Sequence, residues 1–166
     1  SVYIFKRSNT SWAQQAKLLA SDPGSSDYFG NSVAISGDYA IVGALENNDG
    51  GTNSGSAYIF KRSETSWTQQ GKLLASDSGS NDKFGYSVAI SGNYAVVGAY
   101  SWDYYSNQGA VYVFRKTHGT ENWSQKTRLQ ASDGGSGDNF GIGVTIDGNY
   151  IIAGAYNNDD VYTNAG

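Results

Sequence analysis

Short stretches of β-branched and aromatic residues recur along the chain, each bounded by glycine, serine, asparagine or aspartate. Such stretches are typical of strands that bury one side against a core. The first part of the chain predicts four of them, at residues 2–5, 12–19, 32–35 and 39–42. Ser36-Gly37-Asp38 separates the last two, and because these residues tolerate the backbone of a tight turn, we expect a hairpin there.

The same unit occurs three times in tandem. The segment Tyr3-Ile4-Phe5-Lys6-Arg7 returns at Tyr58 and, more loosely, at Tyr112, with a period of about 55 residues. We therefore expect one domain over residues 1–166, made of repeats at approximately 1–55, 56–109 and 110–166. A repeated four-stranded unit of this length is typical of a β-propeller, in which each unit forms one antiparallel blade. A β-solenoid is the alternative, but hairpin turns require antiparallel neighbours and favour the propeller.

Composition supports an all-β chain and excludes several classes of function. Charged residues make up 16% and aromatic residues 14%, with 22 glycines and one proline, a balance that favours short strands and tight turns. A net charge of −4 argues against binding to nucleic acid, which needs a strongly basic surface to neutralise phosphates, and no apolar run approaches the roughly 18 residues of a membrane span. Without cysteine there is no disulfide or thiolate metal site. Because the sequence begins inside a strand pattern, we expect any signal peptide to have been removed or to lie outside this segment.

Three segments carry a motif that begins with Phe-Gly and ends with Gly-Ala, at residues 29–44, 84–99 and 140–155. Together with GSAYIFKR and SWTQQGKLLASD, they resemble the FG-GAP repeats of integrin-type β-propellers, in their bacterial form. The resemblance implies an extracellular or cell-surface protein. It also implies that the Phe-Gly segment leads into the inner strand of a blade and that the Trp-Gln-Gln segment is outermost. Family members often carry a calcium loop between the first two strands, which here is cut to a turn too short for calcium ligands.

The resemblance also sets the blade boundaries. It implies two complete blades, at residues 29–75 and 84–131, together with an outer half at residues 1–20 and an inner half at residues 140–156. The two halves would be one blade split between the N- and C-terminal ends. Since propellers of this family have about seven blades, the missing strands must come from further repeats or from further copies of the chain. Bare strand edges are adhesive, so we expect self-association.

Two sets of loops are expected on one face, because neighbouring strands alternate in direction. The inter-blade loops, which lead from an outer strand to the next inner strand, each carry two aspartates: Asp22 and Asp27, Asp77 and Asp82, Asp133 and Asp138. One hypothesis is a weak Ca²⁺ site made by these carboxylates. The other, which is favoured because two carboxylates are too few, is that aspartate caps the turn by accepting backbone N–H hydrogen bonds.

The intra-blade loops, at residues 45–51, 100–105 and 156–162, differ among otherwise similar copies. The second contains Trp102, Asp103, Tyr104 and Tyr105. Aromatic faces beside an acid suit stacking on, and hydrogen bonding to, a sugar ring, which makes this loop the candidate glycan site. The alternative is an aromatic plug that packs on a neighbouring blade or on another subunit.

The opposite face is expected to be basic, because the third strands end there in pairs of cations: Lys6, Arg7, Lys61, Arg62, Arg115 and Lys116. An acidic face and a basic face would suit head-to-tail stacking into filaments, whereas ordinary solvated strand ends are the alternative. Asn9 and Asn122 begin N-glycosylation motifs in equivalent turns. The single histidine, His118, has no nucleophile to pair with. We therefore expect a non-enzymatic structural and adhesive module without a cofactor, with a lectin-like module as the alternative.

Overall fold

The computed structural model describes residues 1–103 and 106–158, and every regular element in these ranges is a β-strand. None of the described residues belongs to a helix that could serve as a membrane span. The strands are β1 (Val2–Ser8), β2 (Ser11–Leu18), β3 (Val33–Ser36), β4 (Tyr39–Ala44), β5 (Ser56–Ser63), β6 (Ser66–Leu73), β7 (Ser87–Ser91), β8 (Tyr94–Ala99), β9 (Ala110–Lys116), β10 (Trp123–Leu129), β11 (Val144–Asp147) and β12 (Tyr150–Ala153).

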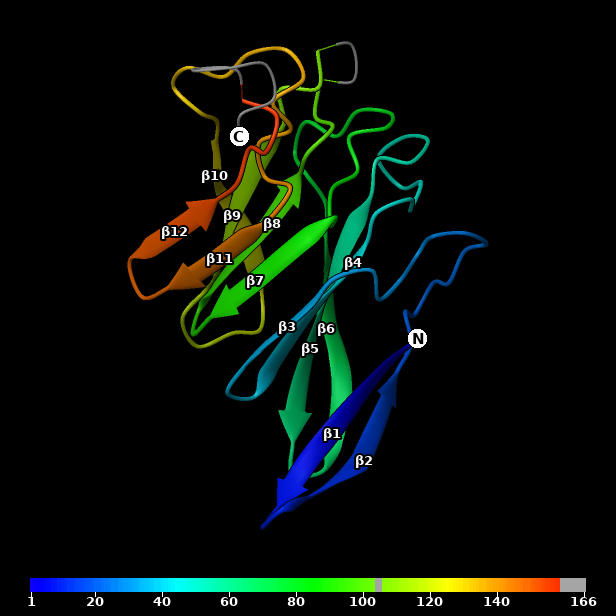
Figure 1. The fold of residues 1–166 in the computed structure, drawn as a ribbon. Coiled ribbons are helices and arrows are strands. Elements are labelled where there is room, and N and C mark those ends of the chain that lie inside the picture. Colours follow the sequence, from blue (N-terminus) through cyan, green and yellow to red (C-terminus); the bar gives the residue numbers. More distant parts are fainter. Residues whose placement is uncertain (104–105, 159–166) are drawn as a thin grey trace.

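The strands form four sheets that follow one another along the chain (Figure 1). Blade 1 has the order β3-β4-β5-β6 and blade 2 the order β7-β8-β9-β10, and every neighbouring pair is antiparallel. The outer half-blade β1-β2 and the inner half-blade β11-β12 are two-stranded sheets. The predicted all-β propeller blades are confirmed, and the antiparallel order excludes the solenoid.

The two half-blades lie at opposite ends of the row, with β1-β2 beside blade 1 and β11-β12 beside blade 2 (Figure 1). They do not pair with each other within the described residues. The split blade that the sequence predicts is therefore present as two separated parts.

Blades pack face to face because alternate residues of each strand point to opposite sides of the sheet. In β4, Ile41 belongs to the core cluster between the two blades, whereas Val42 belongs to the cluster that faces β1-β2. Tyr112 of β9 faces blade 1, and Val111 beside it faces the inner half-blade. Strands buried on both faces explain why the central stretches read as nearly continuous apolar runs.

The Phe-Gly and Gly-Ala motifs fix the spacing between blades. Phe84 packs edge-on against Tyr112 and Phe114, with ring centroids 5.4 and 6.0 Å apart. Gly43 lies against the backbone of Gly85 in blade 2, so closely that a Cβ at Gly43 would be 2.0 Å from the Gly85 carbonyl oxygen. The hydroxyl of Ser32 donates a 2.8 Å hydrogen bond to that oxygen. The motif therefore provides a contact that only glycine allows.

Candidate functional site

The inter-blade and intra-blade loops lie together at one edge of the row, as the sequence predicts (Figure 1). Backbone hydrogen bonds join them: the N–H of Glu46 donates to the carbonyl of Asp27 over 3.4 Å, and the N–H of Asn81 donates to the carbonyl of Thr52 over 2.8 Å. This loop face is the candidate functional surface.

The second aspartate of each inter-blade loop is buried and caps its own turn. The backbone N–H three residues earlier donates to its carboxylate, from Gly24 to Asp27 over 2.8 Å, from Gly79 to Asp82 over 2.6 Å and from Gly135 to Asp138 over 2.7 Å. This is the hydrogen bonding of the turn-capping hypothesis. Because the same hydrogen bond occurs in all three loops, we infer that these aspartates stabilise the conformation of the loop.

The first aspartate of the loop binds a cation from the outer strand of the following blade. Asp22 lies 2.7 Å from Lys72 Nζ on β6, and Asp77 pairs with Arg128 on β10. Asp133 holds the same position in the third loop but has no ion-pair partner within residues 1–103 and 106–158. These ion pairs could not be predicted from the sequence, because each cation lies about 50 residues after its aspartate along the chain.

A glutamine beside a β-bulge in each complete outer strand makes a second link to the same loop. Gln69 donates from Nε2 to Ser21 Oγ and accepts from the Ser21 backbone N–H, both over 3.0 Å, and Gln125 does the same with Ser76 over 2.9 Å. The bulges at these positions break the register of β6 and β10. The cation and the glutamine of an outer strand thus both bind the loop that precedes their own blade. We call this pair of contacts the inter-blade clasp.

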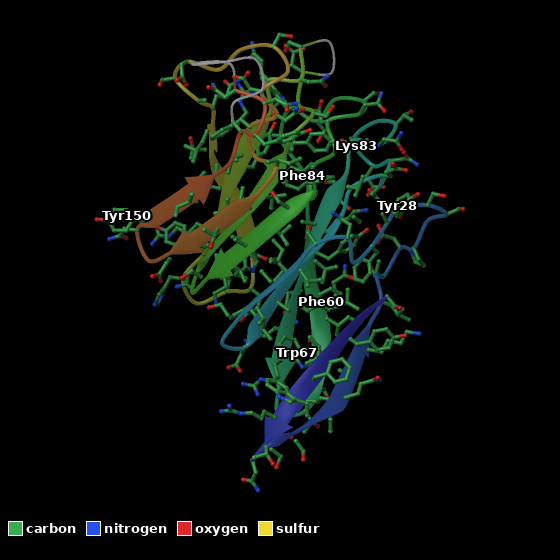
Figure 2. All side chains as sticks on the ribbon, viewed as in Figure 1. Tyr28, Phe60, Trp67, Lys83, Phe84 and Tyr150 are labelled. Atoms are coloured by element: carbon green, nitrogen blue, oxygen red, sulfur yellow. The ribbon has the colours of Figure 1, made fainter. Side chains whose placement is uncertain are left out.

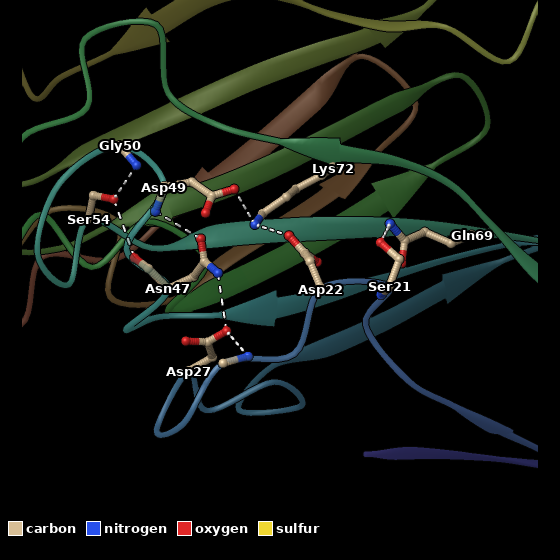
Figure 3. A network of polar contacts seen from close by, with 10 residues as sticks. Ser21, Asp22, Asp27, Asn47, Asp49, Gly50, Ser54, Gln69 and Lys72 are labelled. Atoms are coloured by element: carbon tan, nitrogen blue, oxygen red, sulfur yellow. Dashed lines mark hydrogen bonds and ion pairs between the residues drawn. The ribbon is translucent and has the colours of Figure 1, made fainter.

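Lys72 is the centre of the clasp drawn in Figure 3. Its Nζ lies 2.7 Å from Asp22 and 2.5 Å from Asp49, and 5.1 Å from the ring centroid of Tyr58. Burial disfavours the charged ammonium, but the hydrogen bonds to the two carboxylates outweigh it and raise the pKa of Lys72. For Asp22, burial likewise opposes ionisation, yet the hydrogen bond from Lys72 leaves its pKa below the ordinary value.

Blade 2 differs from its neighbours where the two loops meet. In blade 1, Asn47 donates a 3.1 Å hydrogen bond to the capping carboxylate of Asp27, and Asn158 does the same with Asp138 over 3.3 Å. The equivalent position in blade 2 is Trp102, for which no hydrogen bond to Asp82 is found among the described residues. Its ring packs on the core between the blades and lies 4.1 Å beneath the guanidinium of Arg128.

A cavity of about 590 Å³ opens beside Trp102. Its walls include Asp77, Asp82 and Asp103, and burial raises the pKa of Asp82. The structure thus places Trp102 and Asp103 at a hollow, as the glycan hypothesis requires, while the packing of Trp102 also agrees with the aromatic plug. Tyr104 and Tyr105 lie outside the described residues. No group of three or more residues suited to a metal ion is found in the described ranges.

The edge of the row opposite the loop face is less basic than the sequence predicts. Acidic side chains from neighbouring turns form ion pairs with several of its cations. Lys61 lies 2.7 Å from Glu121, which also accepts a 2.7 Å hydrogen bond from the hydroxyl of Tyr39. Arg62 pairs with Asp38 over 2.5 Å, and Lys116 donates a 2.8 Å hydrogen bond to Tyr39. The hydrogen bond from Lys61 lowers the pKa of Glu121.

The remaining candidates occupy exposed turns. Asn9 lies in the turn between β1 and β2, and Asn122 precedes β10, so both glycosylation motifs are on the surface. His118 is exposed in the same turn as Asn122. No hydrogen bond or ion pair of the His118 side chain is found within the described residues.

Comparison with known proteins agrees with the blade geometry. A scan of protein-family models matches the FG-GAP repeat at residues 12–60, 67–114 and 123–166. The first two matches each run from an outer strand into the third strand of the next blade, and together the three cover most of the chain. No curated protein matches the sequence.

Proposed function

Because the chain belongs to the FG-GAP repeat family, we propose that it is a structural and adhesive propeller module outside the cell, and that it works by associating with further copies of itself. FG-GAP repeats are typically extracellular, and structural rather than enzymatic. The observation that carries the proposal is the apolar surface at both ends of the blade row.

These open surfaces are blade faces of the same kind that are buried inside the row. Tyr3, Phe5 and Val33 are exposed at the end with the outer half-blade, and Tyr150 and Ile152 at the other end. Large contiguous apolar surface on a protein usually marks a site of association. Because the two ends differ in structure, they would bind each other rather than themselves, and such contacts build rings or filaments.

Light scattering over a range of concentrations tests this proposal directly. We expect the average mass to rise above the 17.7 kDa of one chain as concentration increases. Beads coated with the protein should also cluster, whereas beads coated with an unrelated protein should stay dispersed. A mass that stays at one chain at the highest soluble concentration, with dispersed beads, would contradict self-association.

The cavity beside Trp102 supports a second candidate, a lectin-like module. Trp102 replaces the asparagine of the other blades, and the hollow combines its indole with Asp77 and Asp103. Walls that join an aromatic face to hydrogen-bonding acids suit a sugar ring. A glycan array compares the native chain with a variant in which Trp102, Tyr104 and Tyr105 are all alanine. Binding that survives this change would exclude the loop as the glycan site.

A further inference from the structure

An apolar groove of about 240 Å³ lies beside the outer half-blade, between β1 and the inner strands β3 and β4. Its floor includes Val33 and Ile35, which are 57% and 59% exposed. The equivalent residues of blade 2, Val88 and Ile90, are only 8% and 6% exposed, because the inner strands of blade 1 cover them. The groove therefore has the shape and chemistry of a blade face that lacks its covering pair of strands.

The inner half-blade at the other end of the row is such a pair of strands. Figure 2 shows Tyr150 projecting from the far end of β11-β12. Ile152 is 70% exposed, whereas Ile41, its equivalent in blade 1, is completely buried against blade 2. Ile152 is thus an exposed side chain of the kind that would cover Val33 and Ile35.

Building on the proposed self-association, we propose that β11-β12 of one copy occupies the groove of a second copy and that β12 pairs with β1. The two chains then share one four-stranded blade, of order β11-β12-β1-β2. The register follows from the complete blades, where Tyr94 pairs with Arg115 and Val96 with Val113. Transferred to the shared blade, it pairs Tyr150 with Lys6 and Ile152 with Ile4.

Aromatic and cationic contacts favour the same arrangement. Lys61 lies 5.8 Å from the ring centroid of Tyr39, and Arg115 lies 5.6 Å from that of Tyr94. The proposed register gives Tyr150 the same kind of partner in Lys6. It also brings Phe140 against Tyr3 and Phe5 of the second copy, repeating the edge-on packing of Phe29 on Tyr58 and Phe60.

The inter-blade clasp supplies charge complementarity for a second copy of this chain. Lys17 and Gln14 on β2 are equivalent to Lys72 and Gln69 on β6, and they have no carboxylate or serine partner within the described residues. At the other end, Asp133 and Ser132 are the loop residues that lack a clasp. In the shared blade, Lys17 binds Asp133 and Gln14 binds Ser132, as Lys72 binds Asp22 and Gln69 binds Ser21.

Each junction of this kind completes one four-stranded blade from two half-blades. Because the inner half-blade and the groove lie at opposite ends of the row, the contact joins copies head to tail.

Disulfide crosslinking tests the shared blade, because the native chain has no cysteine. Chains with Ile4→Cys are mixed with chains with Ile152→Cys, and a second mixture combines Tyr3→Cys with Ala153→Cys. Directly opposite residues of two antiparallel strands alternate between a wider and a closer Cα–Cα distance. One of the two mixtures therefore places its cysteines at the closer distance. We expect a crosslinked dimer after mild oxidation in at least one mixture, and none in either variant alone.

The control combines Phe5→Cys with Ile152→Cys, which is one residue out of register and points to opposite faces. Equal crosslinking in the control would overturn the register. A protein that associates by light scattering but never crosslinks in register would overturn the shared blade while the proposed self-association stands. A constant mass of one chain would overturn both.

Gly143→Ser offers a gain-of-function test. In the complete contacts, Ser32 donates to the Gly85 carbonyl and Ser87 to the Gly141 carbonyl, over 2.8 and 2.7 Å. The inner half-blade has Gly143 at this position, with open space around it. The added hydroxyl would reach Gly30 of the second copy and tighten association about fivefold per junction, as expected for one hydrogen bond of about 1 kcal/mol. Gly71→Ser on β6 is the control, and an equal effect there would contradict the proposed contact.

Discussion

Replacing Gly43 with alanine tests whether backbone contact between the blades holds the row together. The new Cβ would lie 2.0 Å from the Gly85 carbonyl oxygen and 2.4 Å from Ser32 Oγ. Ordinary contacts of this kind need well over 3 Å, so blade 2 must move away or the side chain of Ser32 must rotate. Either response also disturbs the hydrogen bond between Ser32 and Gly85.

The expected loss of stability follows from these two effects. Overpacking a rigid contact costs about 1–3 kcal/mol, and losing one hydrogen bond costs about 1 kcal/mol more. The free energy of unfolding should therefore fall by about 3 kcal/mol. For a chain of this size, each kcal/mol corresponds to about 2–4 °C, which places the drop in Tm at about 9 °C.

Urea denaturation followed by tryptophan fluorescence and by circular dichroism gives this number. Gly71→Ala in β6 is the matched control, because a Cβ at Gly71 would meet no heavy atom within 4 Å. We expect the control to change stability by less than about 0.5 kcal/mol. If Gly43→Ala and Gly71→Ala unfold at the same urea concentration, the close approach of the blades does not limit stability and the reasoning fails.

Two further substitutions test the packing and the clasp. Ile41→Ala removes a fully buried side chain between the blades and should lower the free energy of unfolding by about 2–5 kcal/mol. Ile35→Ala removes an exposed side chain and, measured on dilute monomer, should lower it by less than about 0.5 kcal/mol. Similar losses for the two variants in urea denaturation would contradict the assigned blade faces. Asp22→Asn tests the ion pair with Lys72. Because the pKa of Asp22 is lowered in the folded protein, its stabilising effect is present above its unfolded pKa of about 3.9 and is lost as pH falls through the lower folded value. The native chain should have the higher Tm at pH 6 and a smaller advantage at pH 2, and a difference independent of pH would refute the ion-pair explanation.

Strands and hairpins were predictable because their causes are local. Gly37 adopts a φ of 58° at the β3–β4 turn, and the sequence Ser-Gly-Asp indicates such a turn without further information. The bulges in the outer strands were not predicted. They recur at the same position in β2, β6 and β10, leaving Gln15, Gln70 and Lys126 without a cross-strand partner, and no turn-forming residue at these three positions marks them in the sequence.

The candidate loops divide in the same way. Capping by Asp27, Asp82 and Asp138 spans three residues, so the sequence alone suggested it as one of two hypotheses. The partner of Asp22 could not be read from the sequence, because Lys72 lies in the next blade. The cavity beside Trp102 also depends on how the two loops fold together.

By itself the sequence determined the repeat and its short strands, because these follow from stretches of apolar residues, turn-forming residues and a motif present three times, and the resemblance of that motif to FG-GAP repeats supplied the strand order and the blade boundaries. Only the tertiary structure showed which faces are covered and which are open. Val33 and Val88 have the same sequence neighbours, yet one is exposed and the other buried. Burial is a property of what packs on a strand, and for the first and last sheets of this row that partner is not adjacent in the chain.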